Sequence, residues 1–347
     1  MKCLRNCWYP AAHSEWLKPD SLQRRVVVEE GLAFFRGRDG LARAVEDRCP
    51  HRFARLSLGV LTEQTVRCKY HGLEFGFDGR CVRNPHGNGS IPDRLSVKVY
   101  PVEERHGFIW VWMGESARGD ASLIPNLSWL DEAPLKATYW GSDLTPVNYQ
   151  LSQDNLMDFS HVDHLHTAFE STGLSGAAGN VELQEDSVVI DWEWDADQPY
   201  LFYRDHMPSG PVRSWTRVTW RAPATIIVWI GSVPRGGRRE DGCFSLGVHA
   251  LCPETRTTTH HNHALTRNYA LDDAELTAAM RAALASINSA EDVPMIQSCQ
   301  EEMGAAELLD LHPVLLQNDK GVIGARKVLD RLIKAEIAAS SAAAQPT

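Results

Sequence analysis

Apolar and polar positions alternate in short runs over the first third of the chain. Residues 25–115 contain brief apolar segments separated by turn residues, and the Asp-Gly pairs at 39–40 and 78–79 are typical of hairpins. Residues 107–114, GFIWVWMG, are almost wholly apolar, as in a buried strand. These patterns predict an all-β N-terminal part and a domain boundary between about residues 115 and 145.

The rest of the chain mixes helical and strand patterns. Residues 144–165 look helical, and apolar spacing predicts further helices over 271–303 and 321–339, with Pro294 suited to a first helical turn. Strands are expected over 187–196, 199–207, 214–233 and 243–253. The predicted fold class is therefore α+β, with domains at 1–120 and 121–347. The Ala/Ser-rich end, 338–347, should be frayed or disordered.

Composition and charge narrow the classes of partner. With 347 residues, 43% of them hydrophobic, the chain can build two domains with sizeable cores. The net charge of −10 argues against nucleic acid or an anionic membrane as a partner. The absence of a long apolar run, at the N-terminus or elsewhere, leads us to expect a cytoplasmic protein. The 8 cysteines are too scattered for a disulfide framework.

Two short pairs of potential metal ligands lie in the N-terminal part. Cys49 and His51 form a C-x-H pair, and Cys68 and His71 form a C-x-x-H pair sixteen residues later. Two such loops can hold a metal centre from both sides. One alternative is a structural zinc site, but such sites usually group cysteines with cysteines, whereas the order here is Cys, His, Cys, His. A second alternative is that the four residues are unrelated and simply lie in loops. The third alternative is a Rieske 2Fe-2S cluster, in which two histidines replace two cysteines on one iron.

A second constellation, DNLMDFSHVDHLH at 154–166, packs three histidines and three aspartates into thirteen residues. On a regular helix Asp158 would face His161, and His161 would pair with His164. His161 and His166 share a face only if the helix is widened, as in a π-bulge, or ends between them. Spacing alone does not decide whether His164 or His166 is the second metal ligand beside His161.

The two constellations together resemble those of Rieske-type mononuclear non-haem iron oxygenases, in the vanillate O-demethylase-like group. Residues 155–166 match the pattern N-x-x-D-x-x-H-x-x-x-x-H, and the similarity runs from NCWYPAAHSEWL to NDKGVIGARKVLDRLIKAE. Respiratory Rieske proteins carry a further cysteine where this chain has Ala54. The resemblance implies an N-terminal Rieske domain and a catalytic domain with an antiparallel sheet packed by helices, of the helix-grip type.

The resemblance also assigns residues. It implies that Cys49, His51, Cys68 and His71 hold the cluster. It implies that His161 and His166 bind Fe(II). The carboxylate that completes the triad is then Asp292, in SAEDVPMIQSCQ, with Glu291 as its rival.

Other residues receive supporting roles from the same resemblance. Asp158 would hydrogen-bond a ligand histidine and bridge to the Rieske histidine of a neighbouring subunit. Asn155 is either part of the pocket wall or a helix cap, and His164 and Asp163 are expected to pack or be solvated. His249 lies where the family places a substrate-pocket residue, although a satisfied core histidine is the equal alternative.

The implied activity is that of a terminal oxygenase component. It would use O2 and electrons to monooxygenate a small aromatic substrate, above all by O-demethylation of a vanillate-like methoxy-aromatic. Methyl or ring hydroxylation, dihydroxylation and N-demethylation are alternatives, and a Rieske electron-transfer protein without oxygenase activity is the alternative of another class.

The implied partners follow from what the chain lacks. No nucleotide-binding glycine motif is present, so NAD(P)H would act through a separate flavin/iron–sulfur reductase or a ferredoxin. The family implies a homotrimer in which an electron passes from His71 through Asp158 to His161 of the adjacent chain.

His260, His261 and His263 form a cluster, and strand alternation would place His261 and His263 on one face. We do not expect that cluster to bind a metal.

Overall fold

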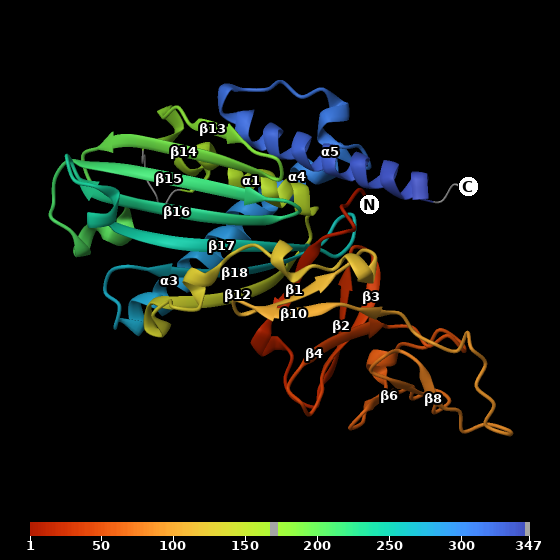
Figure 1. Ribbon diagram of the computed structural model, residues 1–347. Helices are drawn as coiled ribbons and strands as arrows, with labels where there is room; N and C mark the ends of the chain where they lie inside the picture. The colour runs from red at the N-terminus through yellow and green to blue at the C-terminus, as the bar shows by residue number, and fades with distance from the viewer. Residues whose placement is uncertain (167–172, 344–347) are drawn as a thin grey trace. The chain divides into compact units, whose positions relative to one another are not determined.

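The computed structural model describes residues 1–166 and 173–343 (Figure 1). The chain divides into two compact units, Met1–Leu127 with Cys252–Arg256, and Ser128–Leu251 with Thr257–Thr347. Among the described residues, no helix has the length and apolar character needed to cross a membrane.

The first unit is built from three small antiparallel sheets, with strand orders β1-β11-β10, β2-β3-β4-β9 and β5-β6-β7-β8. Its strands are β1 (Trp8–His13), β2 (Leu22–Val27), β3 (Glu30–Arg36), β4 (Ala42–Glu46), β5 (Val60–Leu61), β6 (Thr65–Arg67), β7 (Glu74–Gly76), β8 (Cys81–Arg83), β9 (Val99–Tyr100), β10 (Val102–Arg105) and β11 (Phe108–Trp112).

The sequence pattern accounts for these sheets. Every residue of β11 is buried, as its continuous apolar run indicates. Gly40 and Gly79 adopt φ of 80° and 81°, so the two Asp-Gly pairs do form the turns of the β3–β4 and β7–β8 hairpins. The expected all-β N-terminal part is confirmed.

The second unit contains a seven-stranded antiparallel sheet of order β12-β18-β17-β16-β15-β14-β13. The strands are β12 (Thr138–Thr145), β13 (Asn180–Leu183), β14 (Ser187–Ala196), β15 (Val212–Arg221), β16 (Thr225–Pro234), β17 (Cys243–Pro253) and β18 (Thr259–Arg267). The helices are α1 (Tyr149–Met157), α2 (Val162–Leu165), α3 (Ala274–Ile287), α4 (Val293–Met303) and α5 (Lys320–Ala343).

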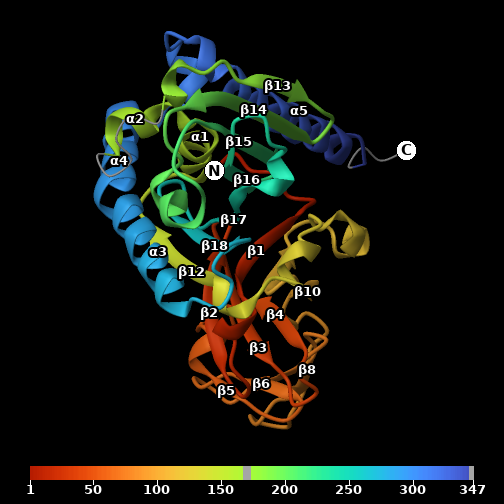
Figure 2. The same cartoon turned by 90° about the vertical axis from the view of Figure 1, so that its left-hand side faces the viewer.

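Helices α1, α3 and α5 pack on one face of this sheet (Figure 2). Two glycines let α5 approach β13 and β14 closely. A Cβ atom on Gly321 would lie 2.1 Å from Ile190 Cδ1, and one on Gly324 would lie 2.5 Å from Leu183 Cδ2. Larger residues at these positions would push the helix off the sheet. The predicted antiparallel sheet packed by helices is confirmed.

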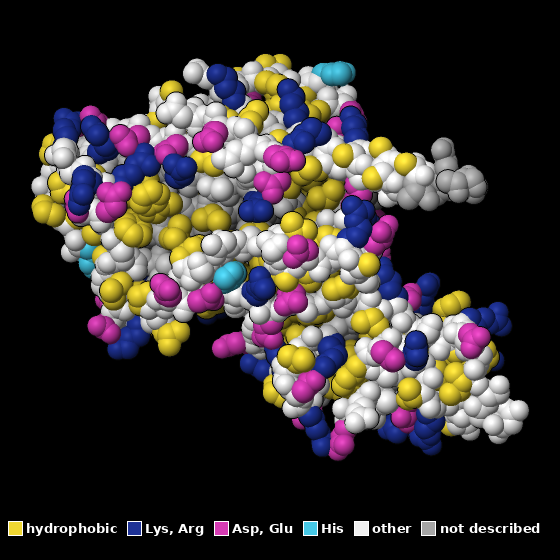
Figure 3. Space-filling model, in the orientation of Figure 1, with side chains coloured by type: hydrophobic (Ala, Val, Ile, Leu, Met, Phe, Trp, Pro, Cys, Tyr) yellow, Lys and Arg dark blue, Asp and Glu magenta, His cyan; other side chains and the backbone are white. Residues whose placement is uncertain are grey.

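The opposite face of β14 and β15 carries charged side chains in alternating positions (Figure 3). Asp191 accepts hydrogen bonds from Arg217 at 3.0 Å and from Arg239 at 3.0 and 3.1 Å. Strand alternation thus separates a charged face from the face that packs under the helices.

Three local predictions were wrong. The strand expected over 199–207 is a 3₁₀ helix, Leu201–His206, because Tyr200 and Tyr203, three residues apart, both pack into the core. The helix expected over 144–165 ends at Met157 and continues as separate short turns. The tail expected to fray from residue 338 continues α5 to Ala343, since alanine favours helix. Its last four residues, 344–347, lie outside the described part.

Candidate active site

The first candidate centre is formed by two loops of the first unit with the same backbone hydrogen bonds. The Cys49 N–H donates to the carbonyl of Ala54 at 2.8 Å, and the Cys68 N–H donates to that of Leu73 at 2.8 Å. Each loop therefore closes on the residue five positions after its cysteine. The repetition brings the cysteine of each loop to an equivalent, buried position.

The fourth residue after each cysteine has a left-handed backbone. Phe53 has φ of 60° and Gly72 has φ of 71°, and their N–H groups donate to the carbonyls of Cys49 and Cys68 at 2.8 and 2.9 Å. Glycine adopts this conformation without strain, whereas phenylalanine does not. The sequence analysis did not identify Phe53 as a special position of this loop.

The side chains of both loops converge. The rings of His51 and His71 lie 4.5 Å apart between centroids. Burial, with a contribution from the neighbouring Cys68 thiol, raises the pKa of Cys49 to about 11. Two adjacent buried thiols next to two imidazoles make a donor set that fits a Rieske cluster, because a metal centre would bind the thiolates and release their protons.

The surroundings of His71 contain two side chains that sequence analysis did not identify. The Tyr70 ring lies 3.9 Å from the His71 ring, and His86 Nε2 lies 2.6 Å from the His71 carbonyl oxygen. Cys81 lies in the hydrophobic core of the same unit, and its thiol donates to the Arg83 carbonyl at 3.4 Å.

The second candidate centre joins the end of α1–α2 to the segment between α3 and α4. His161, His166 and Asp292 each offer a ligand atom, and these atoms lie within 4.8 Å of one another. Asp292 Oδ1 is 3.4 Å from the Nε2 atoms of both histidines. Two imidazoles and one carboxylate on one side of a cavity fit a 2-His-1-carboxylate iron site with open positions.

Breaks in helical geometry make this convergence possible. His161 ends a 3₁₀ turn, Phe159–His161, and His166 follows the last residue of α2. The chain therefore ends its helix between the two histidines, which was one of the two alternatives left open by the spacing. Asp292 lies in a π-helical segment, Asn288–Asp292, that joins α3 to α4. His164 points away and is exposed.

The second nitrogen of each histidine has a protein acceptor. His161 Nδ1 contacts the backbone carbonyl of Asp158, and His166 Nδ1 lies 2.8 Å from Glu291 Oε2. Such partners fix the ring orientation and leave Nε2 for a metal. Glu291, the rival carboxylate of the sequence analysis, thus lies behind His166 rather than beside Asp292.

Asp158 contacts His161, as expected, but through its backbone carbonyl and not through its carboxylate. The contact with His161 is made by the backbone carbonyl, while the carboxylate accepts from the Ser160 N–H at 2.9 Å. The reason is local: Asp158 ends α1 and begins the next turn, where a short carboxylate caps the free N–H groups.

Asn155 is part of the site and not a helix cap. Its Nδ2 donates to Asp292 Oδ1 at 3.1 Å and lies 3.5 Å from His161 Nε2, whereas Asn148 caps α1. Burial by itself would raise the pKa of Asp292, but its interactions with the His161 and His166 rings and with the Asn155 amide hold it below its usual range. The carboxylate is therefore ionised, and its negative charge can coordinate a cation.

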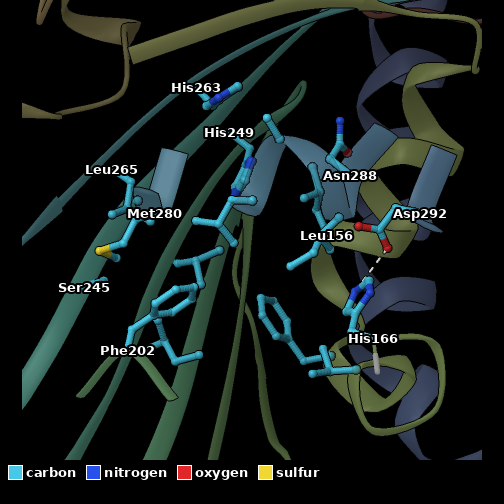
Figure 4. Close-up of a pocket in the computed structure, with 18 of the residues that line it drawn as sticks. Leu156, His166, Phe202, Ser245, His249, His263, Leu265, Met280, Asn288 and Asp292 are labelled. Carbon is cyan, nitrogen blue, oxygen red and sulfur yellow. Dashed lines mark ion pairs between the residues drawn. The ribbon is translucent and has the colours of Figure 1, made fainter. Parts of the chain in front are cut away.

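A cavity of about 220 Å³ opens beside this centre, between the sheet and helices α1 and α3 (Figure 4). Its lining is mainly apolar and aromatic and includes Leu156, Phe159, Phe202, Val228, Ile230, Leu265, Met280 and Leu284. Such a lining suits a small aromatic molecule.

Three histidines outside the candidate iron site are among the polar residues of the cavity lining. His249, on β17, and His261 and His263, on β18, all line it, as strand alternation predicted for the latter two. His249 Nδ1 lies 2.8 Å from His261 Nε2, and the His261 and His263 rings are 5.1 Å apart. His249 is thus both a hydrogen-bonded residue and a pocket residue.

Sequence comparison identifies the class of protein to which this fold and site belong. Residues 7–101 match the Rieske [2Fe-2S] domain, and residues 145–335 match the vanillate O-demethylase oxygenase C-terminal domain. The two matches define a Rieske oxygenase component. Within that class, the chain belongs to the vanillate O-demethylase oxygenase family.

Characterised relatives cover nearly the whole chain. The oxygenase component of chloroacetanilide N-alkylformylase from Rhizorhabdus wittichii is 38% identical over 96% of both chains. The oxygenase component of dicamba O-demethylase from Stenotrophomonas maltophilia is 32% identical over 97% of this chain and 100% of the relative. A vanillate O-demethylase oxygenase subunit from a Pseudomonas species is 31% identical over 98% of this chain and 97% of its own.

Solved structures of similar proteins have the same fold as this chain. Dicamba monooxygenase bound to dicamba superposes with a TM-score of 0.89 at 30% identity, covering 97% of this chain and 100% of that one. Dicamba monooxygenase with non-heme iron and dicamba superposes with a TM-score of 0.81. The chain is therefore the terminal oxygenase of a Rieske system, an enzyme that carries a 2Fe-2S cluster and a mononuclear iron. A separate protein supplies its electrons, because its relatives are oxygenase components.

Proposed function

We propose that this oxygenase O-demethylates a methoxy-aromatic compound, and that its two iron centres are held by the two constellations described above. Cys49, His51, Cys68 and His71 bind the cluster, while His161, His166 and Asp292 bind the mononuclear Fe(II). The observation that carries the proposal is the convergence of these last three residues on the wall of an apolar cavity.

The roles of the chain's own residues follow from their contacts. When bound, the iron supplies the activation of O2. Glu291 and the Asp158 carbonyl orient His166 and His161, and Asn155 fixes the Asp292 carboxylate. The apolar lining orients the aromatic ring and excludes water from the reacting methyl group.

The proposed reaction consumes O2, two electrons and two protons. One oxygen atom enters a C–H bond of the methoxy group, and the other leaves as water. The resulting hemiacetal breaks its C–O bond and gives a phenol and formaldehyde. Release of formaldehyde in equal amount with the phenol, from a panel of methoxy-aromatics and a surrogate reductase, tests the proposal. A hydroxylated or cis-diol product without formaldehyde contradicts it.

N-dealkylation is a second candidate function. It is favoured by the 38% identity to the oxygenase component of chloroacetanilide N-alkylformylase. An N-alkyl anilide in the same panel distinguishes the two, because its dealkylated product is an N–H amide and not a phenol.

The ligand assignment has a matched control within one short segment. His161→Ala should remove the mononuclear iron. The wild type should hold about three iron atoms for every two acid-labile sulfide ions, and the variant about two iron atoms for the same two sulfides. His164→Ala, three residues away and exposed, should leave this ratio and the activity unchanged. Unchanged iron in His161→Ala would contradict the assignment, whatever the activity.

The proposal extends to assembly and electron supply. Residues 1–120 form the cluster domain and residues 121–347 the catalytic domain. A flavin/iron–sulfur reductase or a ferredoxin passes electrons from NAD(P)H to the cluster. In a homotrimer the electron would pass from His71 through Asp158 to His161 of the adjacent subunit, where the Asp158 carbonyl contacts the His161 ring. Mass determination in solution and the cluster-to-iron transfer rate of Asp158→Asn test these points. A cytoplasmic location remains a prediction from the sequence.

A further inference from the structure

The carboxylates and the absence of lysine and arginine give the described lining of the cavity side-chain charges of one sign. Among the described residues, those lining it include no lysine and no arginine, but they include two carboxylates, Asp143 and Asp292. Asp292 belongs to the iron site. Asp143, on β12, lines the cavity and is also exposed, so it lies where the cavity meets solvent. An anionic substrate would therefore meet a negative charge on entry and find no cationic side chain inside.

Two of the cavity histidines, His249 and His261, do not replace a cation. The 2.8 Å contact between His249 Nδ1 and His261 Nε2 holds a single hydrogen, so both facing nitrogens cannot be protonated at once. Burial, followed by the presence of His263, lowers the pKa of His249 to about 3, and burial lowers the pKa of His261 well below its usual value. At neutral pH this pair offers hydrogen-bond donors and acceptors without charge.

The position of His263 depends on a glycine of the neighbouring strand. A Cβ on Gly141 would lie 2.1 Å from His263 Nε2, so the ring lies directly over the β12 backbone. A bulkier cross-strand partner would displace this ring from the cavity lining. The row formed by His249, His261 and His263 is thus built into the sheet and is not a set of loosely placed surface side chains.

The rest of the lining makes an unpaired anion costly. Phe202, Leu265 and Met280 lie around the histidines in the cavity (Figure 4). A carboxylate buried against such side chains loses its hydration without gaining a counter-ion. Bound Fe(II) would bring a positive charge to the Asp292 end of the cavity, and the Asp292 carboxylate would neutralise half of it. A carboxylate attracted to the metal would also compete with O2 for the open positions.

We infer that this cavity selects an uncharged aromatic ether or amide over an aromatic acid of the same shape. The polar group of that substrate would hydrogen-bond to the His249–His261 pair. The inference rests on the proposed function, since it concerns the substrate of the same site, and it names the substrate class that the proposed function leaves open.

A matched pair of substrates tests the inference. 3-Methoxybenzamide and 3-methoxybenzoate have nearly the same shape and differ in charge. We expect kcat/KM for formaldehyde release to be at least about tenfold higher for the amide, and its Kd, measured by titration calorimetry on the iron-loaded enzyme, to be lower by a similar factor. Equal or better binding and turnover of the acid would overturn the inference.

A charge-adding variant sharpens the test. Leu265→Lys places a cation in the lining next to His263 on the same strand face, and Leu265→Met is its neutral control of similar length. The lysine variant should shift the amide-to-acid ratio toward the acid by about tenfold, whereas the methionine variant should not. An unchanged ratio in a folded, iron-loaded lysine variant would contradict the inference.

The two proposals can fail separately. If no compound of the panel releases formaldehyde, the demethylation proposal is wrong, while the binding constants of the matched pair still decide the preference for uncharged molecules. If formaldehyde is released mainly from acids, the demethylation proposal stands and the inference is wrong. Should Leu265→Lys fail to fold, the wild-type binding constants decide alone.

Discussion

The two candidate iron centres differ in how the chain assembles them. The first uses residues 49–71, held on two loops with the same backbone hydrogen bonds. The second joins residues far apart in sequence, such as His166 and Glu291, which are 125 positions apart but 2.8 Å from each other. A local centre can be read as a motif, whereas a distant one depends on the packing of α1, α3 and α4. Substitutions should separate the two centres in the same way.

The largest effect is expected from removing the carboxylate of the distant centre. Asp292→Asn keeps the shape of the side chain but removes the charge that faces both histidine Nε2 atoms. Activity should fall by more than about 100-fold, because even partners behind the ligands cost 10–100-fold. Metal analysis should find the mononuclear iron lost, and the visible spectrum of the cluster should not change. Asp310→Asn, at an exposed position, is the control.

A complementary effect is expected in the local centre. His71→Cys replaces a neutral ligand with a thiolate, so the potential of the cluster should fall far below that of the wild type. Reductase-driven turnover should then be lost, while the mononuclear iron stays bound. Electron paramagnetic resonance of the reduced protein and iron analysis measure the two outcomes. Loss of the mononuclear iron as well would show that the centres are not independent in the way we infer. Cys299→Ser, at an exposed cysteine, is the control.

A smaller effect is expected behind the ligands. Glu291→Ala removes the acceptor of His166 Nδ1, and the affinity for iron should weaken by about 10–100-fold. Glu291→Gln keeps an acceptor oxygen and should weaken it less. Competition with a chelator gives both affinities. An alanine variant that binds iron as tightly as the wild type would mean that other contacts orient His166.

The smallest effect concerns the paired left-handed residues of the local centre. Gly72→Ala should lower the free energy of unfolding by about 1 kcal/mol, because alanine is strained at φ of 71°. Phe53→Gly relieves the same strain at φ of 60°, which offsets the loss of the contact between Arg48 and the Phe53 ring. Its free energy of unfolding should therefore change less. Denaturant titration of the holoprotein measures both, and a larger loss in Phe53→Gly would show that its ring contact outweighs the strain.

The sequence predicted most accurately where a feature depends on neighbouring residues. The Asp-Gly hairpins and the buried strand over 107–114 are short-range patterns, and the structure contains both. The two predicted ligand pairs are also short-range patterns, and their histidine rings converge. Predictions were wrong where tertiary packing overrode the local pattern. Tyr200 and Tyr203 belong to a 3₁₀ helix because the core holds both rings, although their segment reads as a strand.

The candidate catalytic centre shows the same division. Spacing could not choose between His164 and His166, because the answer depends on where the helix ends. Nor could it assign Glu291 and Asp292, which are adjacent in sequence but take different positions in a π-helical segment. Asn155 could be placed in the pocket wall only once α1 was packed against that segment.

The sequence by itself therefore determined the all-β N-terminal part, the α+β class of the second part and the two segments that carry candidate ligands. These follow from residue types and short periodicities, which need no distant contact. Only the tertiary structure decided which carboxylate faces both His161 and His166, which side chains line the cavity and that no lysine or arginine is among those described. Those properties depend on residues brought together from separate elements, and no local pattern encodes the way those elements pack.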